Sequence, residues 1–436
     1  MDSKTKLSTL DFVFDVTDGA RAPQDFSFIF HFSERPSLEH LQAGALSARN
    51  RFPASGAKIK NGNWTSVGSP EAIKTVAVGN DLDATMAVAQ FLDGALSPHR
   101  QLPVSQLLIT AFNHDARLVT RFHHTATDGL GAALWLGHQL RVAYGFEEAV
   151  KERSPFKPVE LRSASTSVRR SQYSYDHACD QLWSSGKRSG KRRWLTFGFP
   201  SPDLKTACRL AGGFTYNDLL ATCTLEVFKE WNRLHSNSSF QRIGLWLPIN
   251  IRQNSSSGFG NGTSRIRLFA RYPPEASLFE KAREIRRQVS WSTRQGEWVV
   301  PEFPALKRLP RWLVSRLVHS YLSLPSVDMA TGIFSHAESG IGDAREAFQK
   351  VQRIECVGLM HPRQLIALNG TTHRGHTWLT FTYDPGLFEF DEVRHLAQMY
   401  LDLIKAALRE AREVRNSNPK VLKSLEATVL RSKHTV

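Results

Sequence analysis

Apolar and polar residues alternate along several segments of the chain, which is the pattern of a β-strand with one buried face. In residues 26–32 phenylalanine occupies every second position, so these side chains would share one face of a strand. Similar patterns predict further strands at residues 104–112, 117–124, 243–251, 265–270 and 378–383. The predicted strands are spread over both halves of the sequence.

Other segments carry apolar residues at the three- and four-residue spacing of a helix. One helix is predicted to begin after Pro36-Ser37 and to end by Phe52-Pro53, because the residue before a proline avoids helical backbone. Further helices are predicted at residues 130–140, 216–231 and 393–407.

One arrangement of strand, turn and helix occurs twice, at residues 118–140 and at residues 378–407. The first copy carries His-His-x-x-x-Asp-Gly at its turn, whereas the second carries Tyr-Asp-Pro-Gly at residues 383–386 and no histidine. If the two halves are structural duplicates, only the first one holds the chemistry.

The length of 436 residues fits two domains or one large duplicated domain, and 41% hydrophobic residues are enough for a packed core. Residues 151–193 are rich in Ser, Arg and Lys and show weak periodicity. We therefore predict an N-terminal half at residues 1–165, a basic crossover at 166–195 and a C-terminal half at 196–436.

The formal net charge is +15, which favours anionic partners such as nucleic acid, a membrane surface or phosphorylated molecules. No zinc finger, RNP motif or helix-turn-helix is recognisable, so nucleic acid is not expected as a partner. The basic residues of the crossover are also compatible with a solvated surface linker.

The remaining composition points to a cytoplasmic protein without a metal. No apolar run is long enough for a transmembrane helix, and the N-terminus lacks the apolar stretch of a secretory signal peptide. The four cysteines have no metal-ligand spacing, so we expect reduced thiols.

The most informative segment is residues 122–129, Phe-His-His-Thr-Ala-Thr-Asp-Gly, where a predicted strand runs into a tight turn. Strand alternation points His123 and His124 to opposite sides, so one can be buried while the other faces a cleft. A neutral imidazole accepts a proton from a hydroxyl or amine near neutral pH. Asp128 can hold the turn through a charge-assisted bond to an arginine, and Gly129 permits a positive φ angle or a close backbone approach.

Two other interpretations of this segment stay open. Both histidines are ordinary core or turn residues in the first. In the second, His123, His124 and Asp128 bind a metal ion, although adjacent strand residues diverge and no further ligand cluster is visible.

The segment His123-His124-x-x-x-Asp128-Gly129 resembles the HHxxxDG motif of the superfamily of condensation domains and chloramphenicol acetyltransferase. This superfamily includes nonribosomal-peptide condensation domains, polyketide-associated acyltransferases, wax ester synthases and alcohol acetyltransferases. Weaker similarities follow in the same order at residues 215–220, 247–252, 260–261 and 383–384. The DFGWG motif of plant-type acyltransferases is absent, and no adenylation or carrier domain adjoins, so a free-standing enzyme is expected.

The resemblance implies an α/β fold in which two chloramphenicol-acetyltransferase-like halves form a V around a central tunnel. It makes His124 the general base, with His123 and Asp128 in support and Gly129 close to the reacting carbonyl. Arg252 is the candidate partner of Asp128. Three further candidates for lining the cleft are Asn217, Ser335 and His336.

The implied reaction transfers an acyl group from a thioester, either acyl-CoA or an acyl group on carrier-protein phosphopantetheine, to an alcohol or amine. It needs no bound cofactor or metal, and natural-product or lipid biosynthesis is the expected context. Two alternatives are an inactive scaffold that binds a carrier protein and a lipid acyltransferase that makes peripheral membrane contact.

Overall fold

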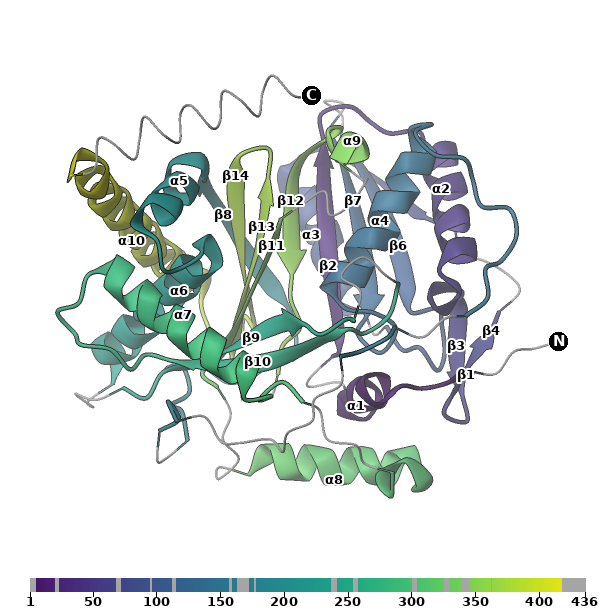
Figure 1. Cartoon of the computed structure of the whole chain (residues 1–436). Coiled ribbons are helices and arrows are strands. Elements are labelled where there is room, and N and C mark those ends of the chain that lie inside the picture. The colour runs from purple at the N-terminus through teal and green to yellow at the C-terminus, as the bar shows by residue number, and fades with distance from the viewer. Residues whose placement is uncertain are drawn as a thin grey trace.

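The computed structural model describes residues 5–19, 23–67, 72–94, 96–111, 115–156, 159–162, 172–175, 178–236, 241–253, 258–299, 304–324, 330–338, 345–361 and 363–417. Two large sheets lie side by side, each with helices packed against it (Figure 1). The predicted α/β class is therefore confirmed. The V shape, its tunnel and the three-part division of the chain stay predictions.

The first large sheet has the strand order β12-β2-β7-β6-β5. Its strands are β2 (Asp25–Phe32), β5 (Lys74–Val78), β6 (Val104–Ala111), β7 (Ala116–His123) and β12 (Val351–Val357). The predicted strands at 26–32, 104–112 and 117–124 are confirmed, although residue 112 lies outside the described residues. β2 and β7 are antiparallel, with Asp25 opposite His123.

Helices cover both faces of this sheet. α2 (Leu38–Arg51) and α4 (Gly129–Ala143) pack on one face around the fully buried Trp135. α3 (Asp81–Asp93) packs on the other face, where Val88 contacts the alternate residues of the strands. α2 begins as predicted because the Ser37 side chain caps it by accepting from the backbone N–H of His40.

The second large sheet has the order β10-β9-β11-β13-β14-β8. Its strands are β8 (Arg193–Pro200), β9 (Gly244–Asn250), β10 (Thr263–Phe269), β11 (Gly332–Glu338), β13 (Ile366–His373) and β14 (His376–Tyr383). Four helices pack with it: α5 (Pro202–Ala211), α6 (Tyr216–His235), α7 (Leu278–Arg294) and α10 (Phe390–Ser417). The predicted strands at 243–251, 265–270 and 378–383 and the helices at 216–231 and 393–407 are confirmed.

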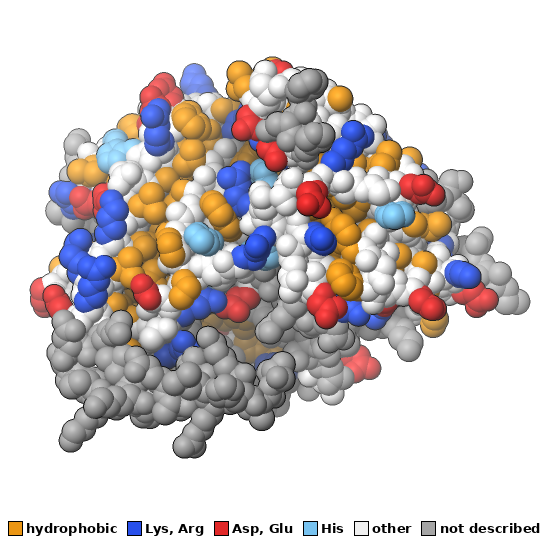
Figure 2. Space-filling model, turned by 90° about the horizontal axis from the view of Figure 1, so that it is seen from above, with side chains coloured by type: hydrophobic (Ala, Val, Ile, Leu, Met, Phe, Trp, Pro, Cys, Tyr) orange, Lys and Arg blue, Asp and Glu red, His pale blue; other side chains and the backbone are white. Residues whose placement is uncertain are grey.

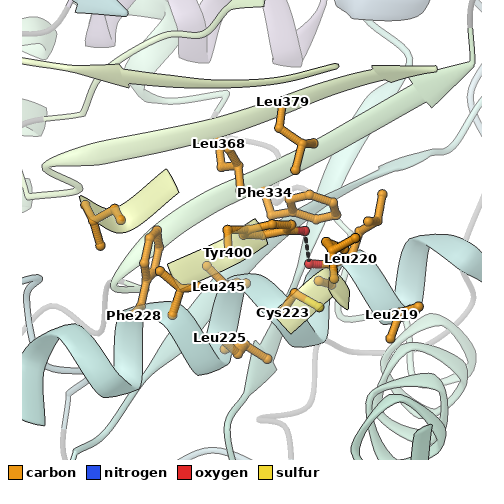
Figure 3. Packing of buried hydrophobic residues seen from close by; sticks show 14 of the residues in the cluster. Leu219, Leu220, Cys223, Leu225, Phe228, Leu245, Phe334, Leu368, Leu379 and Tyr400 are labelled. Carbon is orange, nitrogen blue, oxygen red and sulfur yellow. Dashed lines mark hydrogen bonds between the residues drawn. The ribbon is translucent and has the colours of Figure 1, made fainter. Parts of the chain in front are cut away.

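Buried side chains of α6 and of the sheet form the core of this part (Figure 3). Tyr400 from α10 points into this core, and its hydroxyl donates a 2.8 Å hydrogen bond to the backbone oxygen of Leu220. The bond satisfies a phenol that would otherwise be costly to bury.

The smaller elements surround the two sheets. They are β1 (Thr5–Lys6), β3 (Ala57–Lys60) and β4 (Asn63–Ser66), which form a third sheet, together with η1 (Pro53–Gly56), α1 (Thr9–Thr17), η2 (Leu306–Arg308), α8 (Arg311–Ser323) and α9 (Arg345–Phe348). α1 and α8 pack against each other below the sheets in Figure 1.

Two features join the sheets. β12 falls within the predicted C-terminal half but pairs antiparallel with β2 in the first sheet. Arg192 of the basic crossover is only 3% exposed and donates to Asp25 Oδ2 at 2.6 Å. At Arg192, the interpretation of the crossover as a solvated linker is therefore wrong. Arg169 and Arg170 lie outside the described residues.

Candidate active site

The turn between β7 and α4 is held by the carboxylate of Asp128. Asp128 is the N-cap of α4, and its Oδ1 accepts a 2.9 Å hydrogen bond from the backbone N–H of Gly131. An N-cap satisfies a helix N–H that has no partner within the helix. The same carboxylate reaches across to the second sheet, where Oδ2 accepts from the backbone N–H of Gly262 at 2.8 Å.

The predicted pairing of Asp128 with Arg252 is confirmed. Arg252 Nη2 donates to Asp128 Oδ1 at 2.8 Å, and the two side chains are 0% and 1% exposed. Burial raises the pKa of Asp128, but the positive charge and hydrogen bond of Arg252 outweigh it, so the pKa lies below its usual value. Arg252 Nη2 also donates to the backbone oxygen of Gly260 at 2.8 Å.

His123 is buried, and its ring nitrogens face groups of the protein. Its side chain is 0% exposed, its Nδ1 accepts from the backbone N–H of Thr125 at 3.2 Å, and its Nε2 lies 3.5 Å from Asp18 Oδ2. The expectation that one histidine of the pair is buried is therefore confirmed for His123.

His124 is partly exposed and lies against aromatic rings. Its ring stacks on Phe14 of α1, with centroids 4.0 Å apart, and lies 5.0 Å from the ring of Phe26. The backbone N–H of His124 donates to the backbone oxygen of Gln24 at 2.6 Å, which ties the turn to the start of β2. Both sides of the imidazole are thus positioned by the first sheet and α1.

Asn261 determines which nitrogen of His124 carries the proton. The Asn261 amide nitrogen donates to three oxygens: Asp11 Oδ1 at 2.9 Å, the His124 backbone oxygen at 2.7 Å and the Thr125 backbone oxygen at 3.2 Å. Three acceptors around one atom identify that atom as the NH₂ group, so the amide oxygen faces His124 Nδ1 at 3.3 Å. Nδ1 must then carry the proton, and Nε2 keeps its lone pair.

The side chains packed around His124 also keep its imidazole neutral. Loss of solvation lowers the pKa of His124 from 6.5 to about 4, although the charge of Asp128 partly opposes the shift. Near neutral pH the ring is therefore an unprotonated base, oriented by Asn261. Asp11, which holds Asn261, is itself buried in the capping box of α1, and burial raises its pKa.

Of the two backbone roles expected of Gly129, the positive φ angle is absent, and a close approach to the reacting carbonyl stays a prediction. Gly129 starts α4 without a positive φ angle, and a Cβ at this position would meet no protein atom within 4 Å. Gly131 is the residue that has no room for a side chain, because its Cβ would lie 2.2 Å from Thr127 Oγ1. Gly129 instead leaves open space at the start of the helix.

The three other candidates lie around the second sheet. His336 of β11 has its Nδ1 2.5 Å from Asn217 Oδ1 and its Nε2 2.8 Å from Thr372 Oγ1, and burial lowers its pKa to about 4. Ser335 precedes it on β11, opposite Asn369 of β13. In the described part of the chain, no hydrogen bond or ring contact links His336, Asn217 or Ser335 to His124.

The described residues contain no group of three or more His, Cys, Asp or Glu side chains that could hold a metal ion. His123, His124 and Asp128 are therefore not arranged as a metal site. No described helix has the length and apolar character needed to cross a bilayer. A cytoplasmic location stays a prediction.

No protein-family model matches the sequence, and no curated protein matches it. Solved structures do match. The trichothecene 15-O-acetyltransferase TRI3 from Fusarium sporotrichioides has a TM-score of 0.65 at 13% identity, covering 93% of this chain and 95% of that one. The first condensation domain of the calcium-dependent antibiotic synthetase has a TM-score of 0.65 at 11% identity, covering 94% and 96%.

The chain has the condensation-domain fold. A nonribosomal peptide synthetase, FmoA3, matches with a TM-score of 0.64 at 14% identity over 93% of this chain but only 45% of the synthetase. The chain thus spans less than half the length of that relative. At these identities the comparison establishes the fold and leaves the reaction to be argued from the site.

Within this condensation-domain fold, sequence reasoning missed the residues that orient His124. The sequence points to Asn261 only through the weaker similarity at residues 260–261, and it gives no signal for a role of Asp11 or Phe14. Asp11 and Phe14 are three positions apart on α1, so one helical face presents them together. The capping pattern of Ser8 and Asp11 could have predicted this helix, but its contact with Asn261 has no local signal.

Proposed function

We propose that this chain is a free-standing acyltransferase that moves an acyl group from a thioester to the hydroxyl or amine of a small molecule. The observation that supports the proposal best is the hydrogen bond between His124 Nδ1 and Asn261 Oδ1. It leaves Nε2 neutral with a free lone pair, which is what a general base requires, and Gly129, five residues further on, leaves open space at the start of α4. The donor is acyl-CoA or an acyl group on carrier-protein phosphopantetheine.

In the proposed reaction, His124 Nε2 accepts the proton of the acceptor O–H or N–H as its oxygen or nitrogen attacks the thioester carbonyl. The tetrahedral intermediate then collapses, the C–S bond breaks, and the imidazolium returns the proton to the leaving thiolate. A positioned acid–base group of this kind contributes about 10²- to 10⁴-fold in rate. Asp128 and Arg252 act by holding the turn rather than by moving a proton.

The surroundings of His124 affect its role as a base. The low pKa of His124 disfavours the imidazolium, so the base form is present at neutral pH. Phe14 and Phe26 place apolar surface against the ring, which lowers its solvation.

Thioester turnover tests the proposal. Wild type and His124→Ala are incubated with acyl-CoA and acyl-carrier-protein donors and with alcohol and amine acceptors, and free thiol and product mass are followed. His376→Ala is a matched control, because this exposed histidine lies at the hairpin between β13 and β14. We expect product from wild type and the control and at least a 100-fold loss in His124→Ala.

Equal turnover by wild type and His124→Ala would remove His124 as the base. If no donor–acceptor pair reacts while a carrier protein binds, the chain is a binding scaffold instead of an enzyme.

A further inference from the structure

Three large apolar side chains are exposed on the outward side of α8, which also carries the exposed Arg316 and Ser320. Trp312 is 67% exposed, Leu317 is 51% exposed and Tyr321 is 60% exposed. At about 100° per residue these three side chains fall within roughly one half of the helix circumference. Leu309, 41% exposed, and Leu324, 50% exposed, continue the surface at its two ends. We call these five residues the α8 face.

The inward side of the same helix is firmly attached to the protein. Val314 is 0% exposed, and Arg311 donates to the Asp15 carboxylate at 3.0 Å and to the Asp15 backbone oxygen at 2.7 Å. Leu322 packs against the buried Trp246. Large apolar side chains that are exposed together on one element mark a surface that a partner covers, so the α8 face is a candidate contact surface.

The charged side chains of α8 and of the residues just before it are all positive, and Arg311 among them is paired with Asp15. Residues 304–324, which include η2 and α8, contain Lys307, Arg308, Arg311 and Arg316 and no Asp or Glu. On the face seen from above in Figure 2, by contrast, acidic and basic side chains are interspersed. α8 lies below the sheets in Figure 1, on the other side of the molecule from that face.

We propose that the α8 face lies in the interface of an anionic lipid bilayer, with α8 parallel to the membrane plane. Trp and Tyr favour the headgroup region, leucines favour the acyl boundary, and Lys and Arg favour anionic headgroups. A purely electrostatic acidic protein partner would use the basic residues but leave the apolar side chains uncovered. The bilayer satisfies both properties of the surface.

The position of α8 gives the contact a consequence for the site. α8 packs on α1, and Phe14 of α1 stacks on His124. A membrane below α8 would therefore lie on the side of the molecule from which α1 approaches the catalytic ring. An acyl donor or acceptor dissolved in the leaflet would be presented on that side.

Vesicle flotation tests the inference without any turnover. Wild type is mixed with vesicles of phosphatidylcholine alone or with about one third phosphatidylglycerol, at about 0.1 and 0.5 M salt. We expect binding to the anionic vesicles that weakens at high salt. Trp312→Ser/Leu317→Ser/Tyr321→Ser should bind at least tenfold more weakly, because it removes the apolar contact and keeps every charge.

A matched control is Leu82→Ser/Met86→Ser on α3, whose side chains are 69% and 53% exposed. This variant should bind like wild type. The inference is overturned if wild type ignores anionic vesicles, if the α8 variant binds them undiminished, or if that variant instead loses binding to an acidic carrier protein. His124→Ala should still bind vesicles, so failure of the proposed reaction and failure of this contact are distinguishable.

Discussion

Asp128 and Arg252 are 124 residues apart in the sequence, yet Arg252 Nη2 donates to Asp128 Oδ1 at 2.8 Å inside the protein. The same carboxylate caps α4 and binds the backbone of Gly262. One side chain thus fixes the turn that carries His124 relative to the loop that carries Asn261. The alignment of base and amide depends on this buried ion pair.

Removing Arg252 should destabilise the protein strongly. Arg252→Ala leaves the Asp128 carboxylate buried without its counter-charge, so the free energy of unfolding should fall by about 3–5 kcal/mol in urea titrations. Arg117→Ala is the control, because its partner Asp81 is 85% exposed and exposed pairs contribute at most about 1 kcal/mol. Equal losses in the two variants would contradict a special role for the buried pair.

Asn261→Ala should lower kcat strongly and change KM only slightly. Without the amide, His124 is free to adopt the other tautomer, with the proton on Nε2, and we expect a loss of about 10- to 100-fold. Nitrogen NMR of ¹⁵N-labelled histidine reports the tautomer directly, with Nδ1–H in wild type and a mixture in the variant. Asn63→Ala serves as the control, since the Asn63 amide donates only to a neighbouring backbone oxygen among the hydrogen bonds described. A tautomer unchanged in Asn261→Ala would argue against positioning by this residue.

The pH dependence of kcat/KM should follow the low pKa of His124. The base form is lost as pH falls through about 4, so activity should stay flat from neutral pH to about 5 and decline below. A hydroxyl acceptor and an N-acetylcysteamine thioester avoid ionisable groups in the substrates. An acidic limb centred near 6.5 would show that the imidazole is solvated and the site differently arranged.

The same shift affects stability. The folded pKa of His124 is depressed, so the unfolded chain binds the proton first as pH falls. Its contribution to stability is complete above the ordinary value of 6.5 and is lost as pH falls towards 4. Comparing urea midpoints of wild type and His124→Gln between pH 7 and pH 4 should show wild type losing more stability. Parallel curves would contradict the shift.

Replacement by alanine should affect stability differently at Gly129 and Gly131, which both lie at the start of α4. Gly131→Ala places a Cβ 2.2 Å from Thr127 Oγ1, so we expect destabilisation by at least about 1 kcal/mol. Gly129→Ala meets no protein atom within 4 Å and should leave the melting temperature nearly unchanged. If Gly129 leaves room for the substrate, its alanine variant should lose turnover while keeping its stability; full turnover would show that the open space is not used.

Local patterns were sufficient to predict the elements that build the turn carrying His124. The alternation in β2 and β7 and the caps of α2 and α6 depend on neighbouring residues, so they can be read along the chain. The pairing of Asp128 with an arginine was also predictable, because a carboxylate in a buried turn needs a counter-charge.

Other features depend on contacts between residues that are distant in the sequence, so no local sequence pattern predicts them. β12 pairs with β2 more than three hundred residues earlier, and nothing in its own sequence specifies that edge. In the sequence, Asn261 looks like any other loop asparagine. Only the fold brings Asp11 and two backbone oxygens to its amide nitrogen. For the same reason, grouping Asn217, Ser335 and His336 with His124 could not be decided from the sequence.

The position of β12 also bears on how the chain is made. Until residue 357 has been synthesised, β2 is the open edge of the first sheet, and it carries alternating phenylalanines. An unpaired, apolar strand edge is a template for wrong pairing. The N-terminal residues alone therefore leave this edge of the first sheet unpaired during translation. The edge is protected only after most of the polypeptide has been synthesised.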